Sequence, residues 1–274
     1  MAENSGIEWT HHTFNPWTGC TKLSPACDFC YAEGWAKRSG HVEWGPHGDR
    51  RRTKTWGNPV KWNRQAEAEG VRYRVFCASL ADVFDNHKSI QDQWRTDLWR
   101  LIATTPHLDW LLLTKRPQNV KKMVPWRWGD WPDNVWIGST VEDQKTANQR
   151  IWHLAQIPAR VRFLSCEPLI GPLDLTCVQH VYPESLNALT GELTDDAHAS
   201  TSWVLQIDWV ITGGESGAKY RPADPDWFRS LRDQCAAAKV PFLFKQWEGA
   251  NQKIIKAKGR ELDGVIHDGY PVAA

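Results

Sequence analysis

Three cysteines, Cys20, Cys27 and Cys30, lie on one short stretch near the start of the chain, separated by six and by two residues. Thiolates are ligands of zinc and of iron–sulfur clusters, so thiols this close together are candidates for a metal or cluster site. They do not make a disulfide framework, because three cysteines cannot all pair within the stretch. Turn-forming residues lie between the first two cysteines and a helical pattern over 31–38 follows the third, which predicts a metal-binding loop at the start of a helix.

Two kinds of metal group remain open on these residues alone. A structural zinc site needs four ligands, so His11, His12 or a distant residue would have to complete it. A four-iron cluster held by three cysteines instead leaves one iron free for a ligand that is not protein. Three unligated core cysteines are the weaker interpretation, because the stretch is polar and contains a proline.

The end of the loop, Cys27-Asp28-Phe29-Cys30, resembles the signature of the radical SAM superfamily, although the first gap of six residues is longer than the usual three. The flanking stretches Asn15-Pro-Trp-Thr-Gly-Cys20 and Cys30-Tyr-Ala-Glu33 resemble an uncharacterised, often phage-encoded three-cysteine family, with spore photoproduct lyase as a more distant relative. This resemblance extends over most of the chain. It implies a partial barrel, a [4Fe-4S] cluster on the three cysteines, and S-adenosyl-L-methionine bound at the open iron.

The remainder of the chain alternates apolar runs with helical patterns, which favours a parallel sheet with helices outside it. About seven strands are expected, and we predict an α/β fold with a partial (β/α) barrel of about six to seven parallel strands. The prediction is a single domain over 1–274, with a loop or lid at 41–64 and an insertion at 174–203. The expected strands cover 7–14, 74–79, 108–113, 134–139, 160–165, 208–212 and 240–245, and the expected later helices cover 90–104, 144–154 and 225–239.

Polar residues follow the apolar runs, where parallel strands of a barrel end and sites are built. We therefore expect them to face one mouth. Glycines let backbone amides approach an anionic ligand, and a neighbouring carboxylate can bind an ammonium group or ribose hydroxyls. Radical SAM proteins use such a Gly-Gly-Glu element after the second strand, whereas it follows a late strand here. The predicted cofactor-binding residues are Ser79, Asp82, Ser139, Glu142, Gly213, Gly214, Glu215 and Ser216.

Three residues at the same strand ends are candidates for catalysis. Cys166 ends a strand, and a thiol beside a radical can donate a hydrogen atom, although a small buried residue is the alternative. Lys115, next to Arg116, supplies a cation for a phosphate or carboxylate, with a surface pair as the alternative. Glu167 precedes a proline, which favours an extended backbone, and offers a polar contact to substrate or cofactor.

Composition restricts the partners. The net charge is +1, so contact with nucleic acid would need a local basic patch. The chain has 18 tryptophans, which either pack normally or provide surfaces for stacking on bases. One segment combines basic residues with a tryptophan and is a candidate for contact with nucleic acid: Arg50, Arg51, Arg52, Lys54 and Trp56. A solvated charged loop is the alternative interpretation. The chain shows no signal pattern and no apolar run long enough for a membrane, so we expect a cytoplasmic protein.

These features predict a radical SAM-type enzyme, of lyase or oxidoreductase-like chemistry, that takes electrons from a donor and acts on an unknown substrate. Nucleic acid or a nucleotide is the suggested substrate class, as in DNA repair or modification. The alternative is a non-enzymatic zinc- or cluster-binding protein that docks nucleic acid or a protein partner. A hydrolase that uses Glu167 and Glu215 as paired carboxylates is ranked last, because it leaves the cysteines unexplained.

Overall fold

The computed structural model describes residues 5–179, 184–195 and 202–272. The chain has a mixed α/β fold and divides into two compact units, residues 1–137 and 138–274. Seven strands belong to one sheet, in the order β1-β4-β5-β6-β7-β12-β13. Within the described ranges, no helix is long and apolar enough to cross a membrane.

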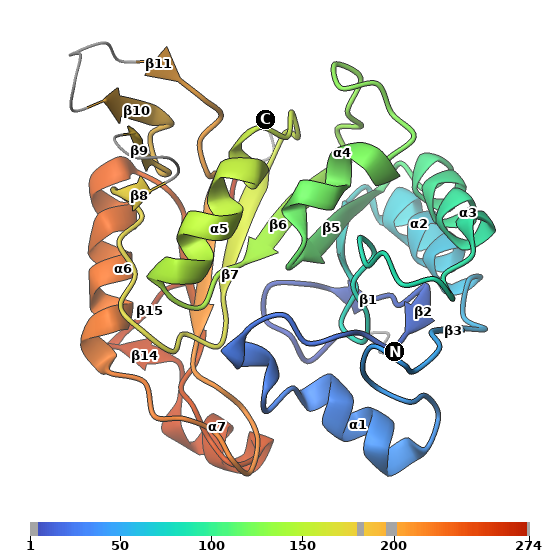
Figure 1. The fold of residues 1–274 in the computed structure, drawn as a ribbon, viewed down its shortest axis with the longest axis horizontal. Coiled ribbons are helices and arrows are strands. Elements are labelled where there is room, and N and C mark those ends of the chain that lie inside the picture. The colour runs from blue at the N-terminus through green and yellow to red at the C-terminus, as the bar shows by residue number, and fades with distance from the viewer. Residues whose placement is uncertain (1–4, 180–183, 196–201, 273–274) are drawn as a thin grey trace. The chain divides into compact units, whose positions relative to one another are not determined.

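The first unit is built on three parallel strands. His12 pairs with Val75, and Val75 pairs with Trp110, so β4 lies between β1 and β5. Helix α2 packs against β4 and β5 (Figure 1). The elements of this unit are β1 (His12–Thr13), β2 (Trp17–Thr18), η1 (Pro25–Cys27), α1 (Tyr31–Ser39), β3 (Arg51–Arg52), α2 (Asn58–Glu69), β4 (Tyr73–Cys77), α3 (Asp92–Ala103), β5 (Leu108–Thr114), η2 (Pro117–Asn119) and α4 (Val120–Met123), with β6 (Val135–Thr140) at its end.

The second unit repeats the arrangement with three more parallel strands. Val210 pairs with Leu164 on one side and with Phe242 on the other, so β12 lies between β7 and β13. Helix α6 packs against β12 and β13 (Figure 1). The elements are α5 (Gln144–Ala155), β7 (Arg162–Cys166), β8 (Val178–Gln179), β9 (Glu184–Asn187), β10 (Glu192–Asp195), β11 (Ser202–Trp203), β12 (Trp209–Gly213), α6 (Pro225–Ala238), β13 (Phe242–Gln246), α7 (Gln252–Lys258), β14 (Glu261–Leu262) and β15 (Val265–Ile266).

Local sequence signals explain where the helices begin and end. Helix α5 starts at a capping box, in which the Asp143 side chain accepts from the Thr146 amide and Thr146 reciprocates. Helices α1 and α2 both end at a glycine in the left-handed conformation, Gly40 and Gly70, which a side chain would disfavour. The boundaries of these helices are therefore set by the chain itself.

In the tryptophan-rich segment after α4, Trp131 is buried, whereas Trp126 and Trp128 are half-buried. Trp131 is buried and its indole N–H donates to the Val135 carbonyl oxygen at 2.8 Å. Trp126 lies edge-on between Trp99 and Trp131, with ring centroids 5.2 and 5.1 Å away. Edge-to-face aromatic pairs of this kind stabilise a core beyond their buried area.

The seven strands and the mixed α/β class confirm the coarse prediction of the fold, and the pairs β1–β4, β4–β5, β7–β12 and β12–β13 are parallel. The first strand is shorter than expected, because only His12 and Thr13 pair with β4. Helix α2 begins at Asn58, inside the range predicted as a loop. The predicted insertion forms a four-stranded antiparallel sheet, β11-β10-β9-β8, and its residues 180–183 and 196–201 lie outside the described ranges.

Candidate functional site

The cysteine loop follows β1 and is tied to the residues after β4. The Gly19 amide donates to the Leu80 carbonyl oxygen at 3.0 Å, and the Cys20 carbonyl oxygen accepts from the Gly45 amide at 3.0 Å. All three loop cysteines are free thiols of intermediate exposure. Cys27 ends the 3-10 turn η1, and Cys30 is the N-cap residue of α1. The loop therefore presents three reduced sulfurs on one segment of the first unit.

The surroundings of the loop thiols differ from one cysteine to another. Burial raises the pKa of Cys20 to about 12; the Asp82 carboxylate adds to the rise and the Arg116 guanidinium opposes it. Burial also raises the pKa of Cys30, against the backbone N–H groups of Glu33 and Ala32, which lower it. Because burial raises the pKa of both thiols, metal binding at either sulfur would release a proton.

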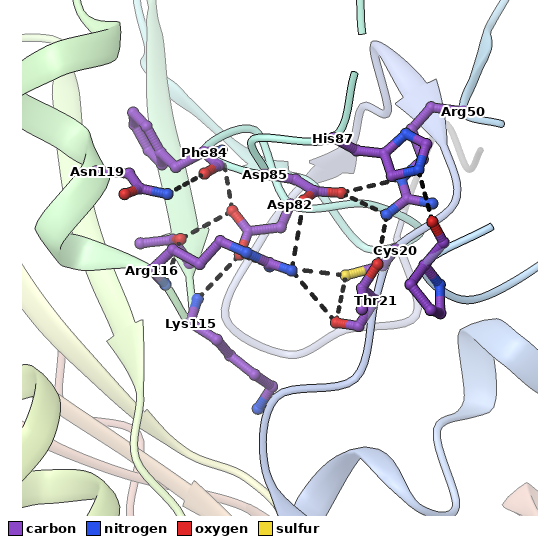
Figure 2. Close-up of polar contacts among 12 residues, drawn as sticks. Cys20, Thr21, Arg50, Asp82, Phe84, Asp85, His87, Lys115, Arg116 and Asn119 are labelled. Atoms are coloured by element: carbon purple, nitrogen blue, oxygen red, sulfur yellow. Dashed lines mark hydrogen bonds and ion pairs between the residues drawn. The ribbon is translucent and has the colours of Figure 1, made fainter. Parts of the chain in front are cut away.

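A buried network of ion pairs lies directly behind the loop (Figure 2). Arg116 Nη1 donates to Asp82 Oδ2 at 2.8 Å, and Arg116 Nη2 lies 3.4 Å from Asp85 Oδ1. The same guanidinium reaches the loop, with Nη1 3.9 Å from Cys20 Sγ and Nη2 3.3 Å from the Thr21 carbonyl oxygen. Burial lowers the pKa of Arg116, but the Asp82 carboxylate, Cys20 and Asp85 outweigh it and the net shift is upward.

Arg50 completes the network from the other side. Its Nε and Nη2 donate to Asp85 Oδ2 at 2.9 and 2.8 Å, and Nη2 also donates to Thr21 Oγ1 at 2.7 Å. Its Nη1 donates to the carbonyl oxygens of Gly45 and Gly48 at 2.9 and 2.6 Å. The Arg50 side chain is completely buried. This arginine is a structural anchor of the loop and is not available to bind a phosphate.

The fit of the loop to a metal group can be tested on these residues. Its donors match a cluster in type and number, because three free thiols lie on one loop. Within the described part of the chain, however, no group of three or more His, Cys, Asp or Glu has the arrangement of a metal site. Binding would therefore require the three sulfurs to come together.

The predicted cofactor residues of the first unit make internal contacts. The Ser79 hydroxyl and backbone hold Asn15 Nδ2 at 3.1 Å and the Tyr31 hydroxyl at 2.8 Å. Asp82 is buried, and its second oxygen accepts from Thr114 Oγ1 at 2.8 Å and from the Phe84 amide at 2.9 Å. The Lys115 amide donates to Asp82 Oδ2 at 3.1 Å, while its side chain extends away from that carboxylate in Figure 2.

A second polar cluster lies at the ends of β7 and β13 in the second unit. Lys245 Nζ is 3.2 Å from Glu167 Oε1, and Glu167 Oε2 accepts from Ser165 Oγ at 3.3 Å. Gly213 leaves room for this carboxylate, since a Cβ there would lie 3.0 Å from Glu167 Oε1. The side chains of Glu167 and Lys245 are 12% and 21% exposed, and the Glu167 oxygen that faces Lys245 is itself buried.

The Gly-Gly-Glu turn is shaped by its own chain. A Cβ on Gly214 would lie 2.2 Å from the Glu248 amide nitrogen, so the glycine permits a close approach of two backbones. Glu215 is buried, and its Oε2 accepts from the Arg221 amide and from Nε, both at 2.8 Å. Ser216 forms a parallel bridge with Gly249.

Three further predicted residues are fully buried in the second unit. Glu142 accepts from Arg150 Nη1 at 2.8 Å and has no exposed side-chain surface. The Ser139 hydroxyl is within 3.4 Å of the Thr140 carbonyl oxygen. Burial raises the pKa of Cys166 well above its ordinary value. The predicted site residues thus form clusters within each unit, and the single mouth that would unite them stays a prediction.

The predicted basic segment keeps some of its exposed groups. Arg51 and Lys54 are exposed. Arg52 is less available, because Nη1 is 2.7 Å from Asp97 Oδ2 and the guanidinium lies 4.1 Å from the Trp56 ring centroid. With Arg50 buried, only part of the predicted surface could meet a polyanion.

The fold and the site define a mixed α/β protein with a parallel sheet and a three-cysteine loop. A family model described as a protein of unknown function (DUF5131) matches residues 4–271, and the chain belongs to this family. No curated protein and no solved structure matches the chain.

Sequence reasoning missed the residues that hold the loop from behind. Asp85 and Thr21 belong to no motif, and Arg116 was interpreted together with Lys115 as a cation for a phosphate or carboxylate. The available signal was the concentration of opposite charges after two adjacent strands, Asp82 and Asp85 after β4 and Arg116 after β5. Parallel neighbours end at the same edge, so such charges are placed to pair.

Proposed function

We propose that this chain is a radical SAM-type enzyme in which Cys20, Cys27 and Cys30 hold a [4Fe-4S] cluster. The observation that carries the proposal is the loop itself, which presents three free thiols of intermediate exposure on one segment that follows β1 and β2. When bound, such a cluster would supply electrons for reductive cleavage of S-adenosylmethionine. The protein would provide the ligands, the orientation and a site closed to water.

The chain's own residues would perform two tasks in this proposal. The buried pairs of Arg50 and Arg116 with Asp85 and Asp82 would keep the loop attached to the strand ends. The Glu167–Lys245 pair would offer a carboxylate and an ammonium group to a polar ligand. Hydrogen bonds in which the donor or the acceptor is ionised are stronger than those between neutral groups.

We also propose a nucleic acid or nucleotide as the substrate class. The support is the pair of exposed cations Arg51 and Lys54 beside the half-exposed Trp56. Cations that contact phosphates and rings that stack on bases are the usual elements of single-strand binding. Affinity for an oligonucleotide should fall steeply with salt if these cations make the contact.

Anaerobic reconstitution with iron and sulfide tests the function. The wild-type chain should bind about four iron atoms, with visible absorbance of a thiolate-bound cluster and an electron paramagnetic resonance signal that changes on adding S-adenosylmethionine. Cys27→Ser should lose the cluster. Cys177→Ser is the matched control, because Cys177 is an exposed free cysteine outside the loop and should have no effect.

Other outcomes separate the alternatives. Stoichiometric zinc without a cluster would exclude the radical mechanism and support the metal-binding docking protein instead. A cluster whose resonance is indifferent to S-adenosylmethionine would retain the iron–sulfur site and refute the assignment to radical SAM chemistry.

A further inference from the structure

Two buried guanidinium groups hold Thr21, the residue that follows the first cysteine of the loop. Arg50 Nη2 donates to Thr21 Oγ1 at 2.7 Å, and Arg116 Nη2 donates to the Thr21 carbonyl oxygen at 3.3 Å. Arg116 Nη1 in addition lies 3.9 Å from Cys20 Sγ. Figure 2 shows the sulfur facing this guanidinium. The chain at Cys20 and Thr21 is therefore held from behind the loop by these two arginines.

The carboxylate of Asp82 determines where Arg116 points. Its Oδ2 accepts from Arg116 Nη1 at 2.8 Å and from the Lys115 amide at 3.1 Å. Its Oδ1 accepts from Thr114 Oγ1 and the Phe84 amide, so both oxygens are engaged within the protein. Asp82 is thus better suited to orient Arg116 than to contact a cofactor.

The described contacts make the three loop sulfurs unequal. Cys20 faces a fixed positive charge, whereas Cys27 Sγ is 3.9 Å from the Ser24 hydroxyl. Cys30 accepts hydrogen bonds from backbone N–H groups at the start of α1. Hydrogen bonds and charges around ligand sulfurs tune the potential of iron–sulfur clusters and the orientation of their ligands. The charges of Lys115 and Lys22 also act on Cys30 and Cys27, but the Arg116 guanidinium reaches the Cys20 sulfur itself, at 3.9 Å.

We infer that Arg116, oriented by Asp82, is a positioning residue for Cys20 that holds its sulfur and favours the more reduced state of a cluster bound there. The inference rests on the proposed function. A positive charge beside a ligand stabilises the additional electron, so it raises the reduction potential, and a negative charge lowers it. Arg116 and Asp82 are close to the same sulfur and have opposite charges, so they should act in opposite directions.

The test is the midpoint potential of the reconstituted protein, measured by anaerobic titration and followed by electron paramagnetic resonance. Arg116→Gln should lower the midpoint and speed the loss of iron to a chelator. Asp82→Asn should raise the midpoint. Arg72→Gln removes a cation of the same unit that pairs with Asp109 and is 43% exposed, and it should leave the midpoint unchanged.

The opposite signs distinguish tuning from simple support of the fold. If both residues only supported the loop, both variants would lose iron faster and shift the midpoint in the same direction, which would overturn the inference. An Arg116→Gln midpoint equal to that of the wild type would overturn it too. If Arg116→Gln does not fold, Arg116→Lys should stay near the wild-type midpoint while Asp82→Asn rises above it.

Failure of the proposed function would be seen differently. A folded wild-type chain that assembles no cluster would refute the function, and this inference with it. A wild-type chain with a normal cluster and S-adenosylmethionine response, together with unshifted variants, would refute only the role of Arg116.

Discussion

Replacing Arg50 by methionine should destabilise the first unit far more than the same change at Arg52. All five N–H groups of Arg50 have an acceptor: two go to Asp85, one to Thr21 and two to the carbonyl oxygens of Gly45 and Gly48. Its side chain is fully buried, and that of Asp85 is 3% exposed. Methionine fills a similar volume but leaves the carboxylate without one of its cations.

The expected loss follows from the burial of this pair. Removing one partner of a buried ion pair costs about 3–5 kcal/mol, because the other charge remains out of water. For a chain of this size the melting temperature should fall by about 6–20 °C. Arg52 pairs with Asp97 where both side chains are partly exposed, at 32% and 27%, so Arg52→Met should cost about 1 kcal/mol or less.

Chemical and thermal unfolding, followed by tryptophan fluorescence and circular dichroism, provide the measurement. The two substituted positions lie two residues apart and both variants lose one arginine charge. A difference between their stabilities therefore reports the effect of burial. Equal losses at Arg50 and Arg52 would refute the reasoning, since exposure would then have no influence. If Arg50→Met does not fold, Arg50→Lys should give an intermediate loss, because lysine retains the charge but not the five donors.

Two further predictions concern the second unit. Gly214→Ala should cost about 3 kcal/mol of stability, because its Cβ would lie 2.2 Å from the Glu248 amide nitrogen and overpacking against backbone reaches this range. Gly171→Ala is the control and should be nearly neutral, since the nearest atom to its Cβ lies at 3.4 Å. Similar urea midpoints for the two variants would contradict this prediction. Burial raises the pKa of Cys235 from 9.0 to about 12, so the folded thiol keeps its proton where the unfolded one ionises, and the stability present below pH 9.0 is lost as the pH rises toward 12. The loss of stability from this thiol should reach about 1.4 kcal/mol at pH 10, and Cys235→Ala should remove that part of the pH dependence. If the unfolding free energy of the variant, measured in urea, falls between pH 8 and pH 10 as much as that of the wild type, the prediction is wrong.

The alternating part of the fold was predictable because its signals are local. Apolar runs predicted β4, β5, β6, β7, β12 and β13 within a few residues, and helical spacing predicted α3, α5 and α6. Helix α2 was missed because charged residues such as Lys61 and Glu67 obscure its buried face, which consists of Pro59, Trp62, Asn63 and Ala66. The strands β8–β11 have two to four residues each, too short for a periodic pattern to be visible.

The candidate site was only partly predictable, because charge pairing depends on distance in space. Composition could not show which of three consecutive arginines is buried, and Arg50 pairs with Asp85 across 35 positions. Asp82 was placed near the cofactor from its position after a strand, but the carboxylate turns out to orient Arg116. A position after a strand predicts that a residue lies at the edge of the sheet, but it does not predict which side chain that residue contacts.

The antiparallel excursion between β7 and β12 has a consequence for how freely the chain can vary in length. Thr212 and its partner Cys166 on these adjacent strands are 46 residues apart, whereas Phe244 and Thr212 on the next pair are 32 apart. The entropy of closing a loop grows only with the logarithm of its length, so the longer connection costs about 0.3 kcal/mol more. Because this free-energy difference is small, insertions and deletions in this connection should be tolerated while the pairing of the two strands persists.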